Sequence, residues 1–410
     1  MISLREHERL TAEHDERFDN MKLVQWTKPM DNQPYGFYAS FKIGAEWVDK
    51  EEALVVTAKR GMEKVDFLQM FMTCFSSDLA LESFSEIYEI DMDKPAINAP
   101  SLQGVISPLI ILHFLSVVGR IKSLKKGYLN RGGNLRKVKG RIKIIKNERL
   151  NVSVKRYDHV YCSYDDFTTD IPENRLIKKA LLFSRLIIES MGSSNSSFDK
   201  VHQLLNRNMA MFEPVSDNVE TREVGQIKGH KIFNEYAEAV RLAKLVLRGY
   251  DYSIKKTGTT NGEVFPFVLD MSLLYEHYVY GLLYEAYGNK IMYQYKGVTG
   301  YPDFLYKSNS YSAILDTKYI PKYENAPLDN YVIRQLSGYS RDIPILKALG
   351  YQEITEESSV PSVPCVIIYP KEGKGPINPF IGKTIQDLCT ERVKKLSQFF
   401  EICIPIPTSQ

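Results

Sequence analysis

The sequence has few cysteines, and they form no recognisable pattern. Five cysteines occur in 410 residues, and no Cys-x-x-Cys pair is found among them. Their odd number argues against a disulfide framework, and their spacing argues against a zinc site. This usage is typical of a protein that works in a reducing cytoplasm, and we expect that location.

Long apolar runs are lacking as well. The most apolar stretch, residues 105–118, contains Pro108 and His113. It is too short to cross a bilayer, which takes about twenty residues. It predicts a buried helix, and we expect no contact with a membrane. Residues 1–7 are charged, which is not typical of a signal peptide.

The chain also lacks a strong net charge and a complete nucleotide-binding loop. The 53 basic and 50 acidic residues leave a net charge of +3, so any contact with nucleic acid needs a local basic patch. Gly382-Lys383-Thr384 resembles the end of a phosphate-binding loop, but Ile377 stands where the first glycine of that motif belongs. We therefore expect no nucleotide hydrolysis by this chain itself.

One local basic patch is present at residues 120–149, which we call the basic arm. Its twelve basic residues are accompanied by a single acid, Glu148. The pattern favours an arm that contacts phosphates or a partner, or a solvated hairpin, and the sequence leaves these alternatives open. Arg131-Gly132-Gly133-Asn134 predicts a turn. Tyr128 is the only aromatic residue of the arm, so base stacking is not expected.

Two aspartates and a lysine lie in strand-like runs further along the chain. Tyr301-Pro302-Asp303-Phe304-Leu305-Tyr306 places an Asp after a Pro, and Ala313-Ile314-Leu315-Asp316-Thr317-Lys318 ends in Asp-x-Lys. Two carboxylates can hold Mg²⁺, and a lysine can steady or deprotonate an attacking water. The layout resembles the PD-(D/E)xK core of metal-dependent nucleases.

The flanks of this motif predict a definite order of elements. Apolar spacing separates helical from strand-like segments. The expected elements are a helix at 270–288, strands at 290–295, 301–306 and 311–318, a helix at 328–348, and a strand at 365–369. Helix, three strands, helix and strand is the order of the PD-(D/E)xK core, so the order supports the motif.

We expect an α+β protein in three parts. Residues 1–160 form a mixed, β-rich N-terminal domain that binds a partner and carries the basic arm. Residues 161–262 form a helical region that packs on the nuclease, and residues 263–410 form an α/β PD-(D/E)xK core of the restriction-endonuclease type. The elements expected before the core are strands at 37–43 and 53–57 and helices at 65–71, 105–121, 172–191, 199–211 and 236–247.

The motif residues have expected roles. Asp303 is the primary metal ligand and Asp316 the second. The backbone carbonyl of Thr317 completes the protein ligands of Mg²⁺, with Mn²⁺ as the alternative metal. Lys318 lies on the same face of its strand as Asp316, because side chains alternate along a strand. It can therefore reach the same phosphate and its attacking water.

Three further residues are candidates for the same site. Glu276, on the preceding helix, joins the site through a water or a second metal, or it is a solvated acid. Gln335 and Tyr339 are four residues apart and share one helix face. They position the lysine, a phosphate or a water, or they simply pack.

Several segments together resemble the McrC family, the nuclease subunits of McrBC-type restriction systems, LlaJI-like systems included. They occur in the family's order between about residues 120 and 340, and the first hundred residues match only loosely. The segments are Gly127-Tyr128, Lys139-Gly140-Arg141-Ile142, Cys162-Ser163-Tyr164-Asp165-Asp166-Phe167, Asp170, Pro172-Glu173-Asn174-Arg175, Leu274-Tyr275-Glu276, Tyr278-Val279, Pro302-Asp303, Leu315-Asp316-Thr317-Lys318-Tyr319, Arg334-Gln335 and Tyr339.

The resemblance implies a Mg²⁺-dependent endonuclease that cuts double-stranded DNA together with a separate McrB-like AAA+ GTPase. It implies that the N-terminal part docks on the motor ring and stimulates nucleotide hydrolysis, while the C-terminal part cuts. The type member's system restricts methylated DNA, and LlaJI-like systems recognise a defined sequence. This chain has no apparent base-reading module, so we expect recognition to lie in the partner. A single core cuts one strand, so a double-strand break would take a pair of complexes or two events.

Two other functions stay open at this point. One is an accessory activator of the GTPase with a weak or vestigial nuclease, and the intact Asp303, Asp316 and Lys318 argue against it. The other is a PD-(D/E)xK enzyme that acts alone. The long N-terminal half, which carries no catalytic signal, argues for a partner instead.

Overall fold

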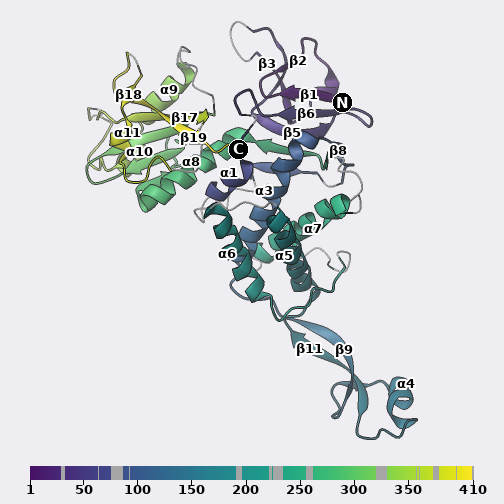
Figure 1. Ribbon diagram of the computed structural model, residues 1–410. Coiled ribbons are helices and arrows are strands. Elements are labelled where there is room, and N and C mark those ends of the chain that lie inside the picture. The colour runs from purple at the N-terminus through teal and green to yellow at the C-terminus, as the bar shows by residue number, and fades with distance from the viewer. Residues whose placement is uncertain are drawn as a thin grey trace. The chain divides into compact units, whose positions relative to one another are not determined.

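The computed structural model describes most of the chain (Figure 1). The described residues are 1–28, 33–62, 64–74, 86–91, 93–190, 196–220, 224, 234–254, 262–319, 330–356, 358–359, 361–372, 378–393 and 395–408. Two compact units are present, Met1–Leu109 with Lys256–Gln410, and Ile110–Lys255. The α+β class is confirmed, whereas the three-part division at residues 160 and 262 stays a prediction.

The first unit begins with β-sheets. A five-stranded sheet has the order β1-β6-β5-β13-β7, a three-stranded sheet has the order β2-β4-β3, and β8 pairs with β12. The strands are β1 (Ile2–Arg5), β2 (Arg9–Thr11), β3 (Val24–Thr27), β4 (Gly36–Ala39), β5 (Lys42–Trp47), β6 (Ala53–Thr57), β7 (Tyr88–Ile90), β8 (Ile97–Asn98), β12 (Glu263–Val264) and β13 (Phe267–Asp270), with a 3-10 turn at Glu16–Phe18. The predicted strand at 53–57 is confirmed as β6.

The single strand predicted at 37–43 is wrong, because two strands of different sheets meet there. β4 ends at Ala39 and β5 begins at Lys42. Between them, Ser40 N donates to Leu23 O at 3.0 Å, and Phe41 O accepts from Met271 N at 2.9 Å. These two residues bond to other segments, so one ladder cannot continue through them. No Gly, Pro, Asn or Asp marks this break in the sequence.

Strand β13 runs directly into helix α8 (Met271–Tyr287), the helix predicted at 270–288. Asp270 caps the helix, since its Oδ1 accepts from Ser272 N at 3.0 Å and from Leu273 N at 3.1 Å. α8 packs on α1 (Phe67–Cys74), the helix predicted at 65–71. Gly281 allows this close packing, because a Cβ there would lie 2.1 Å from Thr73 O.

The rest of the first unit is built on a six-stranded sheet with the order β14-β15-β16-β17-β19-β18. β16, β17 and β19 pair in parallel, and the other pairs are antiparallel. The elements are a 3-10 turn at Gly288–Lys290, β14 (Ile291–Tyr293), β15 (Phe304–Lys307), β16 (Ser312–Thr317), β17 (Cys365–Glu372), α11 (Ile385–Leu388), β18 (Glu391–Arg392) and β19 (Phe399–Ile406). The four predicted strands are confirmed, while β18 and β19 were not foreseen.

The single helix predicted at 328–348 is wrong, because two helices lie there. They are α9 (Asn330–Tyr339) and α10 (Ile343–Leu349), and positions 328–329 fall outside the described residues. Asp342 is the N-cap of α10, and Pro344 stands in its first turn. A proline disfavours helical backbone in the residue before it and lacks the N–H that a helix interior needs. The break therefore had a signal in Asp342 and Pro344.

Helices cover both faces of the six-stranded sheet (Figure 1). On one face, the ring of Tyr280 in α8 lies 5.9 Å from that of Phe304 in β15. On the other face, Leu305 belongs to a buried cluster with Leu336 of α9 and Leu346 of α10. Phe304 and Leu305 are adjacent in β15, and side chains alternate along a strand. They therefore point to opposite faces of the sheet, each toward a different layer of helices.

The second unit contains the predicted helices and a β-ribbon. Helix α3 begins at Pro100, five residues before the predicted start, and continues into this unit. The helices are α3 (Pro100–Gly119), α5 (Pro172–Ser190), α6 (Ser196–Met211) and α7 (Asn234–Ile254). Asn208 of α6 donates from Nδ2 to the carbonyl of Leu115 in α3 at 2.8 Å. None of the described helices has the length and apolar character that a membrane span requires.

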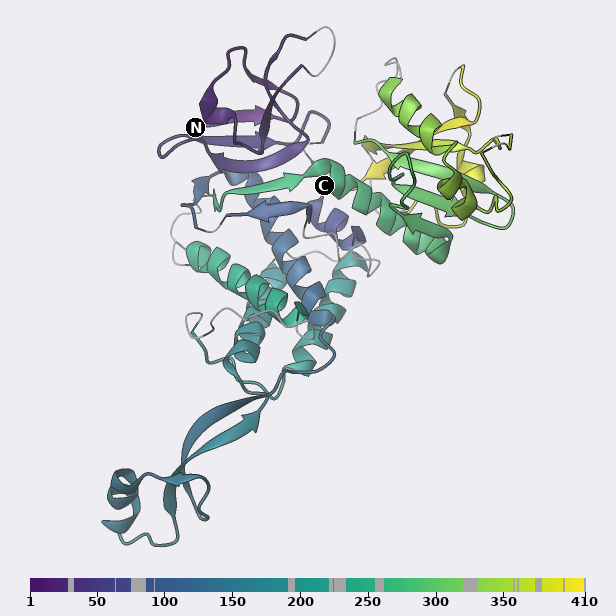
Figure 2. The same ribbon diagram turned by 180° about the vertical axis from the view of Figure 1, so that it is seen from behind.

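The basic arm lies mainly in a long ribbon, which Figures 1 and 2 show with α4 at its far end. β9 (Gly127–Leu135) pairs antiparallel with β11 (Val160–Thr168), and β10 (Arg141–Ile142) pairs with β11. α4 (Ile144–Asn147) and a π-helical turn (Glu148–Val152) follow β10. The turn predicted at residues 131–134 is wrong, because these residues are paired inside β9. Gly132 serves a close cross-strand approach instead, since a Cβ there would lie 2.7 Å from Tyr161 Oη.

Candidate active site

Asp303 lies just before β15 and is held by β16. Its Oδ2 accepts from the backbone N of Thr317 at 2.6 Å and from Thr317 Oγ1 at 2.5 Å. Pro302 precedes it and is buried. Two hydrogen bonds to one oxygen fix the direction of the carboxylate, so the loop that carries Asp303 is joined to the strand that carries Asp316.

Asp316 is fully buried near the end of β16. Lys318 Nζ lies 2.5 Å from its Oδ2 as an ion pair. The other oxygen, Oδ1, has no hydrogen-bond donor among the described residues. Burial raises the pKa of Asp316, and the charge of Lys318 opposes that rise. The acid is therefore incompletely satisfied by the protein.

Lys318 follows β16 and stands between Asp316 and α9. Its backbone N donates to Ile368 O of β17 at 2.9 Å, and its Nζ lies 3.5 Å from Gln335 Oε1. Burial lowers the pKa of Lys318, but the ion pair with Asp316 outweighs burial and the net change is upward. Lys318 is thus held charged by the neighbouring acid.

Gln335 and Tyr339 connect the lysine to the loop of Asp303. Gln335 Nε2 donates to Tyr339 Oη at 3.0 Å, and Tyr339 Oη donates to the carbonyl of Tyr301 at 3.1 Å. The helix spacing of four residues therefore brings both side chains to one polar chain, as the sequence predicts. Their expected role in positioning Lys318 stays a prediction.

Glu276 reaches the same place from α8 through a residue that the sequence analysis missed. Gln294 donates from Nε2 to Glu276 Oε1 at 2.9 Å, and its backbone N donates to Asp303 O at 2.9 Å. Gln294 also has a φ of 45°, which is uncommon for a residue other than glycine. Such strain often lies at functional sites, but it leaves no sign in a sequence. In the sequence, Gln294 lay inside the strand predicted at 290–295, whereas β14 ends at Tyr293 and leaves Gln294 just beyond it.

Negative charge dominates the site. Burial raises the pKa of Asp303 well above its usual range, and the charges of Asp316 and Glu276 raise it further. Burial also raises the pKa of Glu276, and the charge of Asp316 adds to that rise. Lys318 is the cation that opposes them in both cases. Three acids beside one lysine leave room for a further cation.

The oxygens of this site fit a hard divalent metal ion. Asp316 Oδ1 is buried without a hydrogen bond from the described residues, and the hydrogen bonds that Asp303 accepts from Thr317 go to Oδ2. Carboxylate oxygens of this kind suit Mg²⁺ or Mn²⁺. The described residues contain no group of three His, Cys, Asp or Glu that could hold a metal. Asp303, Asp316 and the Thr317 carbonyl remain the predicted protein ligands, and waters would complete the shell.

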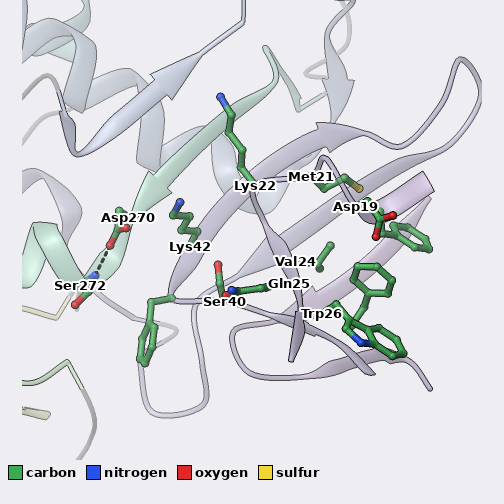
Figure 3. Close-up of a pocket in the computed structure, with 13 residues that line it drawn as sticks. Asp19, Met21, Lys22, Val24, Gln25, Trp26, Ser40, Lys42, Asp270 and Ser272 are labelled. Carbon is green, nitrogen blue, oxygen red and sulfur yellow. Dashed lines mark hydrogen bonds between the residues drawn. The ribbon is translucent and has the colours of Figure 1, made fainter. Parts of the chain in front are cut away.

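A separate pocket of about 530 Å³ lies in the N-terminal sheets (Figure 3). Its lining includes Lys22, Trp26, Lys42 and Asp270. Asp270 is bonded there to the backbone N of Ser272, the dashed line in Figure 3. None of the predicted site residues lines this pocket, so it is not part of the acidic site.

Comparison with known proteins identifies the family. A family model described as a McrBC 5-methylcytosine restriction system component matches residues 81–340, which is more than half of the chain. The chain belongs to the McrBC family. The matched range contains all of the predicted McrBC site residues, from Glu276 to Tyr339, and the whole basic arm.

Two solved McrBC structures are similar to the chain. One is a half-complex from a tetradecameric assembly of Thermococcus gammatolerans McrB AAA+ hexamers with bound McrC, at 14% identity, 99% coverage of this chain, 94% of that chain and a TM-score of 0.38. The other is the Thermococcus gammatolerans McrBC complex, at 13% identity, 69% and 86% coverage and a TM-score of 0.32. At these values, neither likeness bears on function. Comparison with curated proteins gives no match.

Proposed function

We propose that this chain is the DNA-cleaving subunit of a McrBC-type restriction system and that it hydrolyses phosphodiesters with Mg²⁺. The observation that carries the proposal is Asp316, a fully buried acid whose Oδ2 meets only Lys318 and whose Oδ1 has no hydrogen-bond donor in the described part of the chain. A buried charge of this kind is unfavourable unless something compensates it. Lys318 compensates it in part, and a divalent cation shared with Asp303 would complete the compensation.

The metal ligands and Lys318 would have different roles in hydrolysis. Asp303, Asp316 and the Thr317 carbonyl would hold the metal ion, which supplies charge stabilisation for the phosphate and acidifies a water. Lys318 Nζ, held by Asp316 and Gln335, would orient the attacking water and face the scissile phosphate. A positively charged amine also favours the negative charge that develops on the phosphate oxygens.

Glu276 would act one step further from the metal. It has 9% exposure and a hydrogen bond from Gln294, so it is fixed beside Asp303 without being one of its direct partners. An acid in that place can orient a metal-bound water through its second oxygen. The expected effect of its loss is therefore smaller than that of losing Asp316.

The proposal includes an AAA+ GTPase on a separate chain as the partner and double-stranded DNA as the substrate. The basic arm offers a contact surface that is apolar as well as basic, with three side chains that are 74–77% exposed: Tyr128, Ile144 and Ile145. Exposed apolar residues mark protein contacts, whereas phosphate contacts need only the basic ones. This mixture supports a docking arm for the protein partner. A double-strand break would then take two such complexes or two successive cuts.

The test is cleavage of a long plasmid by the full chain, with Mg²⁺ and with the AAA+ GTPase of the same system and GTP. Asp316→Asn should lower the cleavage rate by about a hundredfold or more. Asp387→Asn is the matched control in the same core, because the Asp387 side chain accepts from Thr384 in the capping box of α11 and an Asn oxygen can accept in the same way. Cleavage at the wild-type rate by Asp316→Asn would refute the site. Stimulation of GTP hydrolysis without any cleavage would leave an accessory activator instead.

A further inference from the structure

Two ionisable side chains at one edge of the N-terminal sheet contact Tyr319, the residue that follows Lys318. β1 and β6 pair in parallel, with Arg5 opposite Thr57, so both strands end at the same edge of the sheet. Glu6 is the first residue after β1, and Lys59 is the second residue after β6. Parallel strands deliver the residues beyond their ends to one place. That place is occupied by Tyr319 of the nuclease core.

The contacts among these three residues are close and buried. Lys59 Nζ donates to the carbonyl of Tyr319 at 2.6 Å and lies 3.4 Å from the centre of its ring. Tyr319 Oη donates to Glu6 Oε2 at 3.3 Å, and the backbone N of Lys59 donates to the same oxygen at 3.0 Å. Glu6, Lys59 and Tyr319 are only 3%, 7% and 2% exposed. We call these three residues the buried link.

The buried link acts on the backbone of the candidate active site. Lys318 and Tyr319 are adjacent, and their backbone is held from two sides. β17 accepts the Lys318 N–H through Ile368 O, and Lys59 donates to Tyr319 O. The direction of the Lys318 side chain depends on this short stretch, because it begins just after β16 ends at Thr317.

A second contact reaches the other side of the site. The rings of Tyr319 and Tyr275 lie 6.0 Å apart, and Tyr275 directly precedes Glu276 in α8. α8 in turn continues from β13, a strand of the same N-terminal sheet. The sheet is thus connected to Lys318 through Tyr319 and to Glu276 through α8.

Two buried ionisable side chains are a poor means of holding two parts together, since apolar side chains of similar volume would avoid their desolvation. Their directed hydrogen bonds to Tyr319 do fix a relative position, because each buried polar group must meet its partner. The buried link therefore has the chemistry of a positioning device and not of simple packing.

We propose that Glu6 and Lys59 are positioning residues for Lys318, through which the N-terminal sheet sets the geometry of the nuclease site. A displacement of the sheet, as on partner binding, would change the place of Lys318 relative to Asp316. The cleavage readout of this proposal rests on the function proposed above, but its structural readout does not.

The test uses the full chain with the double substitution Glu6→Gln and Lys59→Met. Removing both charges leaves no lone charge buried, so the variant avoids the main reason for misfolding. Tyr319 O then loses its donor, while the side-chain volumes stay similar. Leu54→Ala is the control, because Leu54 is a buried residue of β6 in the N-terminal core and lies outside the buried link.

The first readout is the rate at which Lys318 is reductively methylated, followed by mass spectrometry. Lys318 should react slowly in the wild type, since its side chain is 22% exposed and ion-paired. The rate should rise by about fivefold or more in the double variant and stay unchanged in Leu54→Ala. An unchanged rate in the double variant overturns the proposal, whether or not the protein cleaves DNA.

The second readout is cleavage with the AAA+ GTPase, GTP and Mg²⁺. The double variant should have a kcat lowered by about tenfold with an unchanged KM for DNA, as expected for misplacement of a reacting group. An equal loss in Leu54→Ala would assign the effect to stability and overturn the positioning role. If the wild type does not cleave but the methylation result holds, the function proposed above fails and the positioning of Lys318 stands.

Discussion

Two glycines on the helices that cover the six-stranded sheet should respond to alanine in opposite directions. Gly281 lies in α8, and a Cβ added there would be 2.1 Å from Thr73 O and 2.8 Å from Thr73 C. Gly338 lies in α9, and a Cβ added there meets nothing closer than the Cβ of Thr299 at 3.9 Å. The chemical change is the same at both positions. The neighbouring atoms therefore decide whether alanine raises or lowers the free energy of unfolding.

The magnitudes follow from two opposing effects. Ala is better than Gly in a helix interior by about 1 kcal/mol. At Gly338 nothing opposes this gain, so Gly338→Ala should raise the free energy of unfolding by up to about 1 kcal/mol. At Gly281 the new methyl group would have to displace the backbone of α1, and such overpacking costs about 1–3 kcal/mol or more. At the upper end of that cost, about 3 kcal/mol, the gain of about 1 kcal/mol in helix propensity offsets only part of it. Gly281→Ala should therefore lower the free energy of unfolding by about 2 kcal/mol.

The assay is urea unfolding of the full chain, with the transition of the first unit followed by near-ultraviolet circular dichroism. Gly281→Ala should lower the urea midpoint and Gly338→Ala should raise it or leave it unchanged. Because Glu276 lies on the same helix as Gly281, cleavage should also fall in Gly281→Ala. A raised midpoint in Gly281→Ala would refute the close packing of α1 on α8.

Three further predictions concern single side chains. Tyr339→Phe removes one acceptor and one donor from the chain between Gln335 and the Tyr301 carbonyl, so cleavage should fall by roughly fivefold to tenfold at unchanged stability, measured as kcat on plasmid DNA. Burial lowers the pKa of His113 to about 4 from an ordinary 6.5, so the unfolded chain takes up the proton first and stability is lost as pH falls from 6.5 to 4. His113→Gln should reduce that loss by up to about 3 kcal/mol, measured by urea unfolding at pH 7 and pH 4. Asn174 donates from Nδ2 to two backbone carbonyls at 2.6 and 2.9 Å, so Asn174→Ala should lower the free energy of unfolding by about 1–3 kcal/mol, and an unchanged midpoint would contradict its structural role.

Elements with a strong local signal could be predicted from the sequence. The helix at 270–288 and the strands on either side of Asp303 and Asp316 have regular apolar spacing, and each is present. Gln335 and Tyr339 share a helix face because their spacing fits one turn, and they do meet in one polar chain. Local periodicity was sufficient in these cases because a single element decides the arrangement.

The elements that were predicted wrongly or missed depend on tertiary contacts. Residues 37–43 change sheet without a turn signal, and β19 is added to the core by parallel pairing with β17, which depends on a distant strand. Gly132 lies in a strand because its lack of a side chain serves a close approach to Tyr161, whereas a Gly-Gly pair normally predicts a turn. Tertiary contacts decided these places, and no local pattern records them.

The candidate site also contains residues that a local motif predicts and residues that depend on tertiary contacts. Asp303, Asp316 and Lys318 were predicted from a short motif, and the structure brings them together. Gln294 and the buried link could not be predicted, since Gln294 depends on an unusual φ and the link joins Glu6 to Tyr319, which are 313 positions apart. Residues that position a catalytic group often act across such separations, so a motif search does not find them.

The most direct measurement is the location of Mn²⁺ by anomalous X-ray diffraction from crystals of the full chain and of Asp316→Asn, both soaked in MnCl₂. One strong peak should lie between the carboxylates of Asp303 and Asp316 in the wild type, and it should be absent in the variant. A peak at another place, or no peak in protein that cleaves DNA with Mn²⁺, would contradict the assignment of these acids as the metal ligands.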